Sequence, residues 1–397
     1  MAFLKYLLPA LAATQLVFAD SKCDETTIET QSDADELASC KTVKAIKIKS
    51  TYNQALSLSG VEKIENDLIC ETCPDLKSIS ADSLSSIGGN FTLFNVTTLT
   101  DLSMPKLTSI GKIRFDSVPA LTSLSFDKGV DETDDVTITN TGLNSLSGIT
   151  LKKVGTLNVQ ANNDLREINL NDLKNASGII NLSLNKDSLS VKFPNLGTAK
   201  GMNFRNISSV EVPSLEECDG EINFAGTQFK TFYAPNLTAS GDMGFSGNKE
   251  LTNITLPVLK TIKGGFTITR NDKLEIIDLP KLKEVSGAID FAGTFDTVSM
   301  GSIDIVRGKF NIQSTSSKFS CDSFDKEQKS KRPFKGTYTC KEKESDPKGI
   351  NHKSGTSGGS SKTGGDSNET TGAAAVNGIA TPAVGVAAFF YALAQLV

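Results

Sequence analysis

The sequence predicts an all-β chain folded as a right-handed parallel β-solenoid of about 11 turns with about 22 residues in each. The first observation is a unit repeated at near-constant spacing, which indicates a stack of small structural units and not a set of globular domains. The second is that no stretch keeps an apolar helical period for three turns. The units begin at Leu76, Leu99, Leu121, Leu143, Leu165, Leu189, Val210, Phe229, Leu251, Leu274 and Phe295.

Within each unit, apolar residues alternate with small or polar ones. Ile289 and Phe291 are an example, and a period of two residues is that of a half-buried strand. Proline and glycine recur at fixed offsets, as at Pro257 and Gly264, where corners need special dihedral angles or lack a hydrogen-bond donor. Each turn therefore contains at least one short strand, and the apolar residues form the core.

Asparagine recurs shortly before new units, with two or three residues between it and the start of the unit. Stacked asparagine side chains can hydrogen-bond from turn to turn, and asparagine tolerates a left-handed backbone conformation. We therefore expect a column of asparagines at one corner of the coil. Its members are Asn95, Asn140, Asn162, Asn185, Asn206, Asn248 and Asn271.

The repeats span residues 76–318, so both ends of the stack need caps. We assign residues 20–75 to the N-terminal cap and first turn, and residues 319–343 to the C-terminal cap. Residues 1–19 have the pattern of a signal peptide with cleavage after Ala19, since a positive charge precedes an apolar stretch and small residues end it. The chain is therefore expected to enter the secretory pathway, where disulfides form.

Cysteines flank the repeats at the two predicted caps. Local pairing of Cys23 with Cys40, and of Cys321 with Cys340, would close each cap with a bond that contributes roughly 3 kcal/mol in the chain-entropy model. The number of cysteines leaves other connectivities open.

Three cysteines lie within the coil itself. Cys70 and Cys73 have the spacing of a redox pair, but they lie in a repeat turn and not between a strand and a helix. We interpret them as a structural bond or as two buried thiols. Cys218 is then left as a small buried core residue.

The C-terminus has the pattern of a glycosylphosphatidylinositol (GPI) anchor signal. Residues 344–371 form a polar stalk rich in Ser and Gly, and the chain ends in 15 apolar residues from Ala383 to Val397. A transmembrane helix is the alternative, but a span needs about 20 apolar residues. Gly372 best fits the attachment residue and Asn377 is the alternative, so residues 373–397 would be removed.

Eight asparagines lie in N-glycosylation triplets, a density that fits a secreted glycoprotein. We expect Asn181, Asn236 and Asn253 to be better acceptors than Asn95 and Asn206, because an asparagine that points into a corner could not carry a sugar. The eight are Asn90, Asn95, Asn175, Asn181, Asn206, Asn236, Asn253 and Asn368.

Residues that could support catalysis are few. The only histidine, His352, lies in the stalk, so the repeats contain no Ser-His or Cys-His pair. The acidic run at 131–135 could bind a cation or serve a carboxylate-using enzyme, but a solvated corner is the favoured reading. We predict no catalytic residue, no metal site and no cofactor.

The charge of the chain also limits its partners. A net charge of −5 argues against nucleic acid. A basic run is present at Lys326, Lys329, Lys331, Arg332 and Lys335. It could contact anionic headgroups or phosphorylated glycans, although a solvated loop is the simpler reading.

Taken together, these features resemble the fungal GPI-anchored proteins of cell-wall organisation, with leucine-rich turns like those of receptor L-domains. The resemblance rests on units such as Leu251–Ile268 and Leu99–Gly111, combined with the two terminal signals. The chain departs from the repeat pattern around Gly129 to Asp135, where an acidic stretch replaces the usual corner.

The resemblance implies a glycoprotein on the outer face of the plasma membrane and in the cell wall. We expect it to be non-catalytic and to support wall integrity, either by organising wall polysaccharides or by holding wall glycoproteins. Two rivals stay open: a carboxylate-dependent wall-polysaccharide enzyme, and a surface receptor or adhesin. Carboxylates clustered on one outer face would favour the enzyme, and an exposed apolar patch would favour the receptor.

Overall fold

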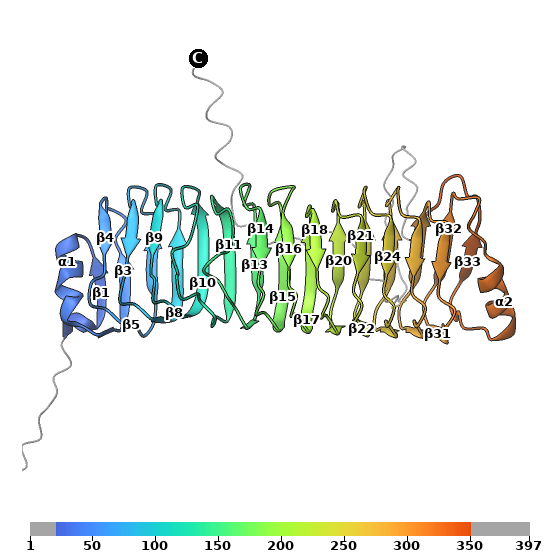
Figure 1. Cartoon of the computed structure of the whole chain (residues 1–397), viewed down its shortest axis with the longest axis horizontal. Coiled ribbons are helices and arrows are strands. Elements are labelled where there is room, and N and C mark those ends of the chain that lie inside the picture. Colours follow the sequence, from blue (N-terminus) through green and yellow to red (C-terminus); the bar gives the residue numbers. More distant parts are fainter. Residues whose placement is uncertain (1–20, 351–397) are drawn as a thin grey trace, which may run out of the picture.

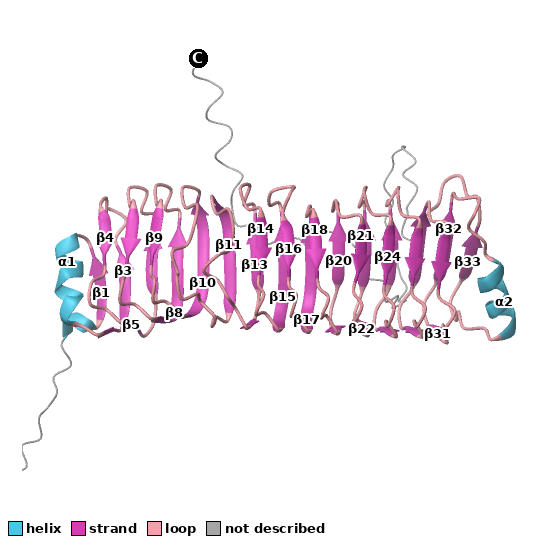
Figure 2. Ribbon diagram, in the orientation of Figure 1, coloured by secondary structure: helices cyan, strands magenta, loops and turns pink. Residues whose placement is uncertain are grey.

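The computed structural model describes residues 21–350, which form a stack of turns along one axis (Figure 1). Helix α1 (Gln31–Glu36) lies at the N-terminal end and helix α2 (Asp322–Ser330) at the opposite end. Between them the regular structure is almost all strand (Figure 2). The fold is a parallel β-solenoid of about 13 turns, so the predicted fold class is confirmed. Among the described residues, no helix has the length and apolar character that a membrane span requires.

Each turn crosses three sides of the coil, and its strands pair in parallel with the equivalent strands of the neighbouring turns. We call the first side the long sheet, because it runs from the first turn to the last. Its strands are β1 (Glu25–Ile28), β3 (Ala45–Ile48), β6 (Leu68–Glu71), β8 (Ser86–Phe94), β10 (Ser109–Val118), β11 (Asp135–Thr141), β13 (Leu157–Gln160), β15 (Asn175–Ser183), β17 (Thr198–Arg205), β20 (Ile222–Ala225), β23 (Met243–Ser246), β26 (Phe266–Thr269), β29 (Ile289–Gly293), β32 (Phe310–Ser314) and β33 (Tyr338–Lys341).

The second side is narrow, and the long strands β8, β10, β15 and β17 cross from it onto the long sheet. Its own strands are β2 (Thr42–Val43), β5 (Lys63–Ile64), β12 (Lys153–Val154), β19 (Glu217–Cys218), β22 (Ala239–Ser240), β25 (Thr261–Ile262), β28 (Glu284–Val285) and β31 (Ile305–Val306). The third side has three separate sheets: β4 (Ala55–Ser57), β7 (Ser78–Ser80) and β9 (Asp101–Ser103); β14 (Glu167–Asn169), β16 (Ser190–Lys192) and β18 (Ser209–Glu211); and β21 (Thr231–Tyr233), β24 (Asn253–Thr255), β27 (Ile276–Asp278) and β30 (Thr297–Ser299).

The coil has more turns than the predicted eleven because the long sheet continues beyond both ends of the recognised repeats. Strands β1, β3 and β6 precede Leu76 and pair with one another in register. After Lys318, strand β33 pairs with β32. The first and last turns carry cysteines and short apolar pairs in place of the leucine unit, so the repeat pattern does not mark them.

The core is a continuous column of apolar side chains that each turn shares with the next. The rings of Phe204, Phe224 and Phe245 follow one another with centroids 5.6 and 5.3 Å apart. Phe266 and Phe291 continue the row, with centroids 4.9 Å apart. Edge-on and tilted ring pairs add to the hydrophobic stabilisation, so each turn depends on its neighbours for burial.

The predicted asparagine column is in fact two adjacent columns, which corrects the sequence interpretation. Asn95, Asn140 and Asn206 have positive φ values of 53°, 51° and 57°, so they make the left-handed corner. Residues one position later point inward, and among them Asn162 and Asn248 are fully buried. Asparagine suits both positions for different reasons, and therefore the pattern alone did not separate them.

The inward asparagines satisfy backbone groups that the corner leaves without partners. Asn248 Oδ1 accepts the backbone N–H of Thr227 at 2.8 Å, and Asn248 Nδ2 donates to the carbonyl of Phe224 at 3.1 Å. Asn271 repeats both contacts one turn later, accepting from the Asn248 N–H and donating to the Phe245 carbonyl. Each side chain thus replaces the ladder hydrogen bonds that end where the chain turns.

The N-terminal end of the core is covered by α1 and two short 3-10 helices, η1 (Ser21–Cys23) and η2 (Leu37–Ser39). Asp33 Oδ2 accepts the backbone N–H groups of Glu29 and Thr30 at 2.9 and 2.7 Å and holds the start of α1. These hydrogen bonds lower the pKa of Asp33. A disulfide joins Cys23 to Cys40, with Cα atoms 5.8 Å apart.

The C-terminal end of the core is covered by α2 and an aromatic stack. The rings of Phe310 and Phe334 are stacked with centroids 3.8 Å apart, and Tyr338 stacks on both. A disulfide joins Cys321, at the start of α2, to Cys340 in β33. Both caps therefore prevent another chain from pairing with the ends of the core.

The remaining cysteines lie inside the coil. Cys70 and Cys73 are joined to each other, and both side chains are fully buried. Cys218 is a buried free thiol, and its burial raises its pKa to about 12. A thiol in this environment is a poor nucleophile at neutral pH.

Replacing Asn248 by alanine is expected to destabilise the coil strongly. The change leaves the Thr227 N–H without its acceptor in the interior, at a cost of about 1–3 kcal/mol, and removes one hydrogen bond to the Phe224 carbonyl. The urea midpoint of unfolding measures the loss. Asn163→Ala, at an exposed site one residue after the inward Asn162, is the control and should stay within about 0.5 kcal/mol. Equal effects of the two changes would contradict the role of the inward asparagines.

Peptide mapping without reduction tests the cysteine pairs. We expect fragments that join Cys23 to Cys40 and Cys321 to Cys340, because each pair closes one cap. A thiol reagent should modify Cys218 only after denaturation. Fragments that link an N-terminal cysteine to a C-terminal one, or rapid labelling of Cys218 in the native protein, would refute this arrangement.

Candidate functional surfaces

The acidic run at 131–135 lies at a corner of the coil, and two of its carboxylates form ion pairs with lysines. Lys152 Nζ lies 2.6 Å from Asp131 Oδ2, and Lys112 Nζ lies 2.9 Å from Asp135 Oδ2. The amide of Thr156 donates to Asp135 at 2.8 Å and, together with Lys112, lowers the pKa of that carboxyl. Within residues 21–350, no group of three or more His, Cys, Asp or Glu side chains is arranged to hold a metal ion. Two of the four carboxylates in the run are therefore held by lysines, while Glu132 and Asp134 are exposed to solvent.

The carboxylates that best fit the rival enzyme lie on the long sheet. Glu221 and Asp242 directly precede the paired residues Ile222 and Met243, so they face outward on adjacent strands. Partial burial and the neighbouring Asp242 carboxylate raise the pKa of Glu221. Asp242 Oδ1 accepts the Gly265 amide at 2.7 Å. Glycosidases use two carboxyl groups, and the one that acts as the general acid has a raised pKa.

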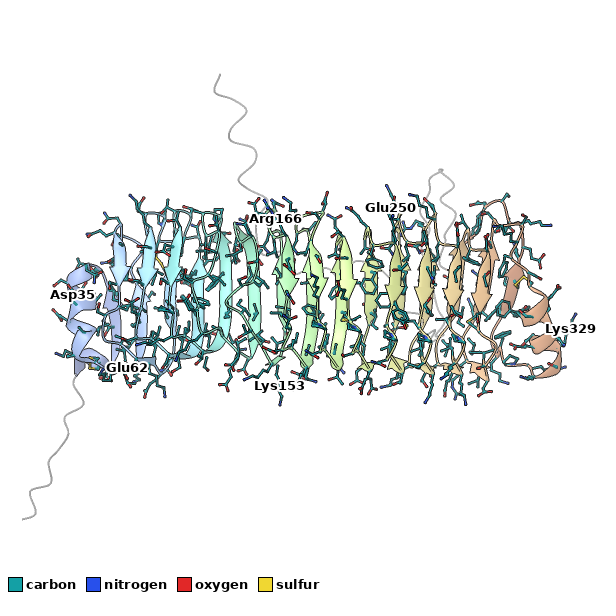
Figure 3. All side chains as sticks on the ribbon, viewed as in Figure 1. Asp35, Glu62, Lys153, Arg166, Glu250 and Lys329 are labelled. Carbon is teal, nitrogen blue, oxygen red and sulfur yellow. A yellow bond between two sulfur atoms is a disulfide. The ribbon has the colours of Figure 1, made fainter. Side chains whose placement is uncertain are left out.

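Much of the ionic pairing lies along the edges of the coil. Figure 3 shows Glu62 and Lys153 along one edge, and Arg166 and Glu250 along the opposite edge. Lys41 pairs with Glu62 there, and Lys273 pairs with Glu250 at 2.7 Å. Exposed pairs of this kind contribute little to stability.

A row of small polar side chains runs along the outer surface of the long sheet. We call it the central row, and its members occupy equivalent positions on successive strands. Only one of them, Asp290, is ionisable. The row consists of Thr137, Asn158, Asn181, Asn203, Asn223, Gly244, Thr267, Asp290 and Asn311.

Members of the central row hydrogen-bond from strand to strand. Asn181 Nδ2 donates to Asn158 Oδ1 at 2.9 Å, and Asn311 Nδ2 donates to Asp290 Oδ1 at 2.8 Å. Sequence reasoning missed this row. The available signal was asparagine between two apolar residues in four consecutive turns, as in Leu157-Asn158-Val159.

The start of the predicted stalk lies on this same surface. Residues 344–350, which we call the strap, run back across the last strands of the long sheet. Glu344 N donates to the Ser314 carbonyl at 2.9 Å, and Ile350 N donates to Asp290 Oδ2 at 2.9 Å. The strap covers Asp290, which is only 7% exposed, and burial raises the pKa of its carboxyl.

The predicted glycosylation sites are spread over several sides of the coil. Asn90 and Asn236 are exposed, while Asn181 and Asn253 are half-buried. Asn95 and Asn206 belong to the outward left-handed column and are half-buried too, so the expectation that they point inward is wrong. All of these sites stay predictions, as does Asn175, which lies at the first residue of β15.

The basic run begins in α2 and continues past its end. Lys326 and Lys329 line a shallow surface depression together with Asp322 and Asp325, so acidic and basic groups alternate there. Lys335 Nζ donates to the Arg332 carbonyl at 2.8 Å. The mixed charge does not form a continuous cationic surface.

The terminal predictions lie outside the described residues. They are the cleavage site after Ala19, the glycosylation site Asn368, and the attachment residue Gly372 or its alternative Asn377.

Two family models match the chain. One, described as a GPI-anchored cell wall organization protein, matches residues 1–38. The other, a BspA type leucine-rich repeat region in 6 copies, matches residues 34–169 and 202–327. The second match covers most of the coil. No solved structure is significantly similar to the chain.

The similar curated proteins are fungal. The protein named ecm33 of Aspergillus fumigatus is 50% identical over 360 residues, which are 90% of each chain. A cell surface GPI-anchored protein of Arthroderma benhamiae is 38% identical, over 89% of this chain and 92% of the relative. The cell surface GPI-anchored protein ECM33 of Candida albicans is 28% identical, over 86% of this chain and 84% of the relative. The names of the last two relatives place them at the cell surface with a GPI anchor. The chain belongs to the family of fungal GPI-anchored cell wall organization proteins.

Proposed function

We propose that this protein is a non-catalytic organiser of wall components, tethered outside the cell by a GPI lipid, and that the long sheet is its contact surface. The observation that carries the proposal is the central row, which repeats neutral hydrogen-bonding groups from turn to turn. A flat, periodic surface suits a long partner better than a small substrate, which usually binds in a concave pocket. Wall polysaccharides are the favoured partner and wall glycoproteins the alternative.

The surface receptor or adhesin has weaker support. The largest exposed apolar side chains include Leu184 at 69% and Tyr233 at 58%, and they lie in different turns and on different sides. Single exposed apolar residues are ordinary on protein surfaces, whereas a binding patch needs them together.

The second candidate function is a carboxylate-dependent polysaccharide enzyme at Glu221 and Asp242. The raised pKa of Glu221 favours it, because a general acid must hold its proton near the working pH. Against it, the pair lies on a flat sheet surface and Asp242 already accepts a backbone amide.

Incubation with wall polymers separates the two functions. The purified protein is mixed with β-1,3-glucan, β-1,6-glucan, chitin or mannan, and both retained protein and new reducing or unsaturated ends are measured. We expect retention on at least one polymer and no new ends. New ends that Glu221→Gln abolishes and Glu275→Gln preserves would establish the enzyme instead. Glu275 is an exposed carboxylate on the third side and serves as the control.

Release by phosphatidylinositol-specific phospholipase tests the tether. We expect the enzyme to free the protein from membranes, and mass spectrometry of the freed protein to find a C-terminal peptide ending at Gly372. Retention after both phospholipase and anhydrous acid would instead identify an uncleaved apolar tail.

A further inference from the structure

The second half of the long sheet differs from the first in its glycosylation triplets. Asn90 in β8 and Asn181 in β15 lie next to buried strand residues and face outward from the long sheet. After β15, no strand of the long sheet within the described part of the chain contains such a triplet. The later triplets, at Asn206, Asn236 and Asn253, lie at a corner or toward the third side. The surface from β17 to β32, which we call the bare surface, is therefore free of predicted glycans.

The strap shows what the bare surface can bind. The carbonyl of Lys348 accepts hydrogen bonds from Asn311 Nδ2 at 2.9 Å and Gln313 Nε2 at 3.1 Å. The amide of Lys348 donates to Gln313 Oε1 at 3.2 Å. Together with the hydrogen bond from Ile350 N to Asp290, these contacts pair both backbone donors and a backbone acceptor of a segment that lies across the strands.

The strap fits closely because Gly349 has no side chain. A Cβ atom at Gly349 would lie 3.0 Å from Asp290 Oδ2 and 3.5 Å from Thr269 Cγ2. A larger residue at this position would therefore push the strap away from the sheet. The groups beneath it, at Asp290, Asn311 and Gln313, would remain unchanged.

The binding groups continue beyond the strap. Toward the N-terminus, the central row continues on successive strands with Thr267 and Asn203, which are half-buried, and with Gly244 and Asn223, which are buried. Neighbouring strands are about 4.8 Å apart, so the row offers polar groups at a regular interval. These side chains are uncharged and can both donate and accept, apart from Gly244, which leaves room above the backbone.

We propose that the bare surface binds a single extended chain of a neutral β-linked polysaccharide, and that the strap occupies part of the same site and competes with it. The proposal rests on the function proposed above and names the surface and the ligand class. The hydroxyl groups of a sugar polymer match side chains that donate and accept at a repeated spacing. The absence of Trp from the sequence leaves hydrogen bonding as the main contact.

Strap release is the first arm of the test. Gly349→Val is compared with Gly301→Val, because a Cβ at Gly301 meets nothing within 4 Å. Lys348→Pro, which removes the donor to Gln313, is a second release variant. Hydrogen exchange at Ile350 reports whether the strap has opened. If the strap is closed in about nine molecules of ten, the apparent affinity for the ligand is about tenfold weaker than that of the open form. Release should therefore lower the Kd for soluble β-1,3-glucan or chitin oligosaccharides by up to that factor.

Removal of the amides is the second arm. Asn203→Val with Asn223→Val replaces two central-row amides by residues that suit strands. We expect the Kd to rise at least tenfold, if each lost pairing costs about 1 kcal/mol. Thr231→Val with Thr297→Val makes a similar change on exposed strand positions of the third side and should leave the Kd unchanged.

The outcomes separate this proposal from the broader function. If the oligosaccharides bind and neither strap release nor the Asn203 and Asn223 changes alter the Kd, the bare surface is not the binding site. The proposal that the protein organises wall polymers would then remain. If no variant binds either oligosaccharide but the intact protein is still retained on wall polymers, only the proposal that the ligand is a single polysaccharide chain is refuted. Failure of all polysaccharide binding would overturn both, and would direct the search to wall glycoproteins.

Discussion

The whole structure depends on parallel pairing between one turn and the next, because a single turn of about 22 residues cannot bury its own apolar side chains. Phe224 illustrates this dependence, since its ring contacts Phe204 in the turn before and Phe245 in the turn after. An end turn has only one such neighbour. The two helices, the aromatic stack on Phe310 and the terminal disulfides supply what the missing neighbour would otherwise provide.

Stacking also determines what the corners require. A corner residue in the left-handed conformation ends the ladder of backbone hydrogen bonds, and the next residue turns inward beneath it. At Asn162, Asn185, Asn248 and Asn271, one amide accepts an N–H and donates to a carbonyl of the preceding turn. The side chain therefore continues the ladder where the backbone cannot.

The fold could be predicted from the sequence because the alternation of apolar and polar residues directly indicates which side chains are buried. Residues such as Ile289 and Phe291 must alternate if one side of a strand faces the core, and the repeat then fixes how strands follow one another. The corner was harder, because left-handed and inward asparagines are neighbours and both positions favour the same residue type. The extra turns were missed because Cys70 and Cys340 stand on strands where other turns have Val, Phe or Ile.

Less of the functional surface than of the fold could be predicted from the sequence. The strap has the composition of a linker, and its partners lie about 30 to 60 residues earlier in the chain. No local pattern connects Ile350 with Asp290. The central row was visible as a repeated asparagine, but strand register was needed to show that Asn158, Asn181 and Asn203 stand side by side on the outer surface.

The central row differs physically from the charged edges in how much freedom its side chains lose on binding. Lysine and glutamate have long side chains, and fixing each one costs up to about 2 kcal/mol of conformational entropy. Asparagine and threonine are short, and strand-to-strand hydrogen bonds such as that from Asn311 to Asp290 already restrict them. A row ordered before contact loses little entropy when a partner binds, so weak hydrogen bonds repeated over several turns can add up to a stable contact.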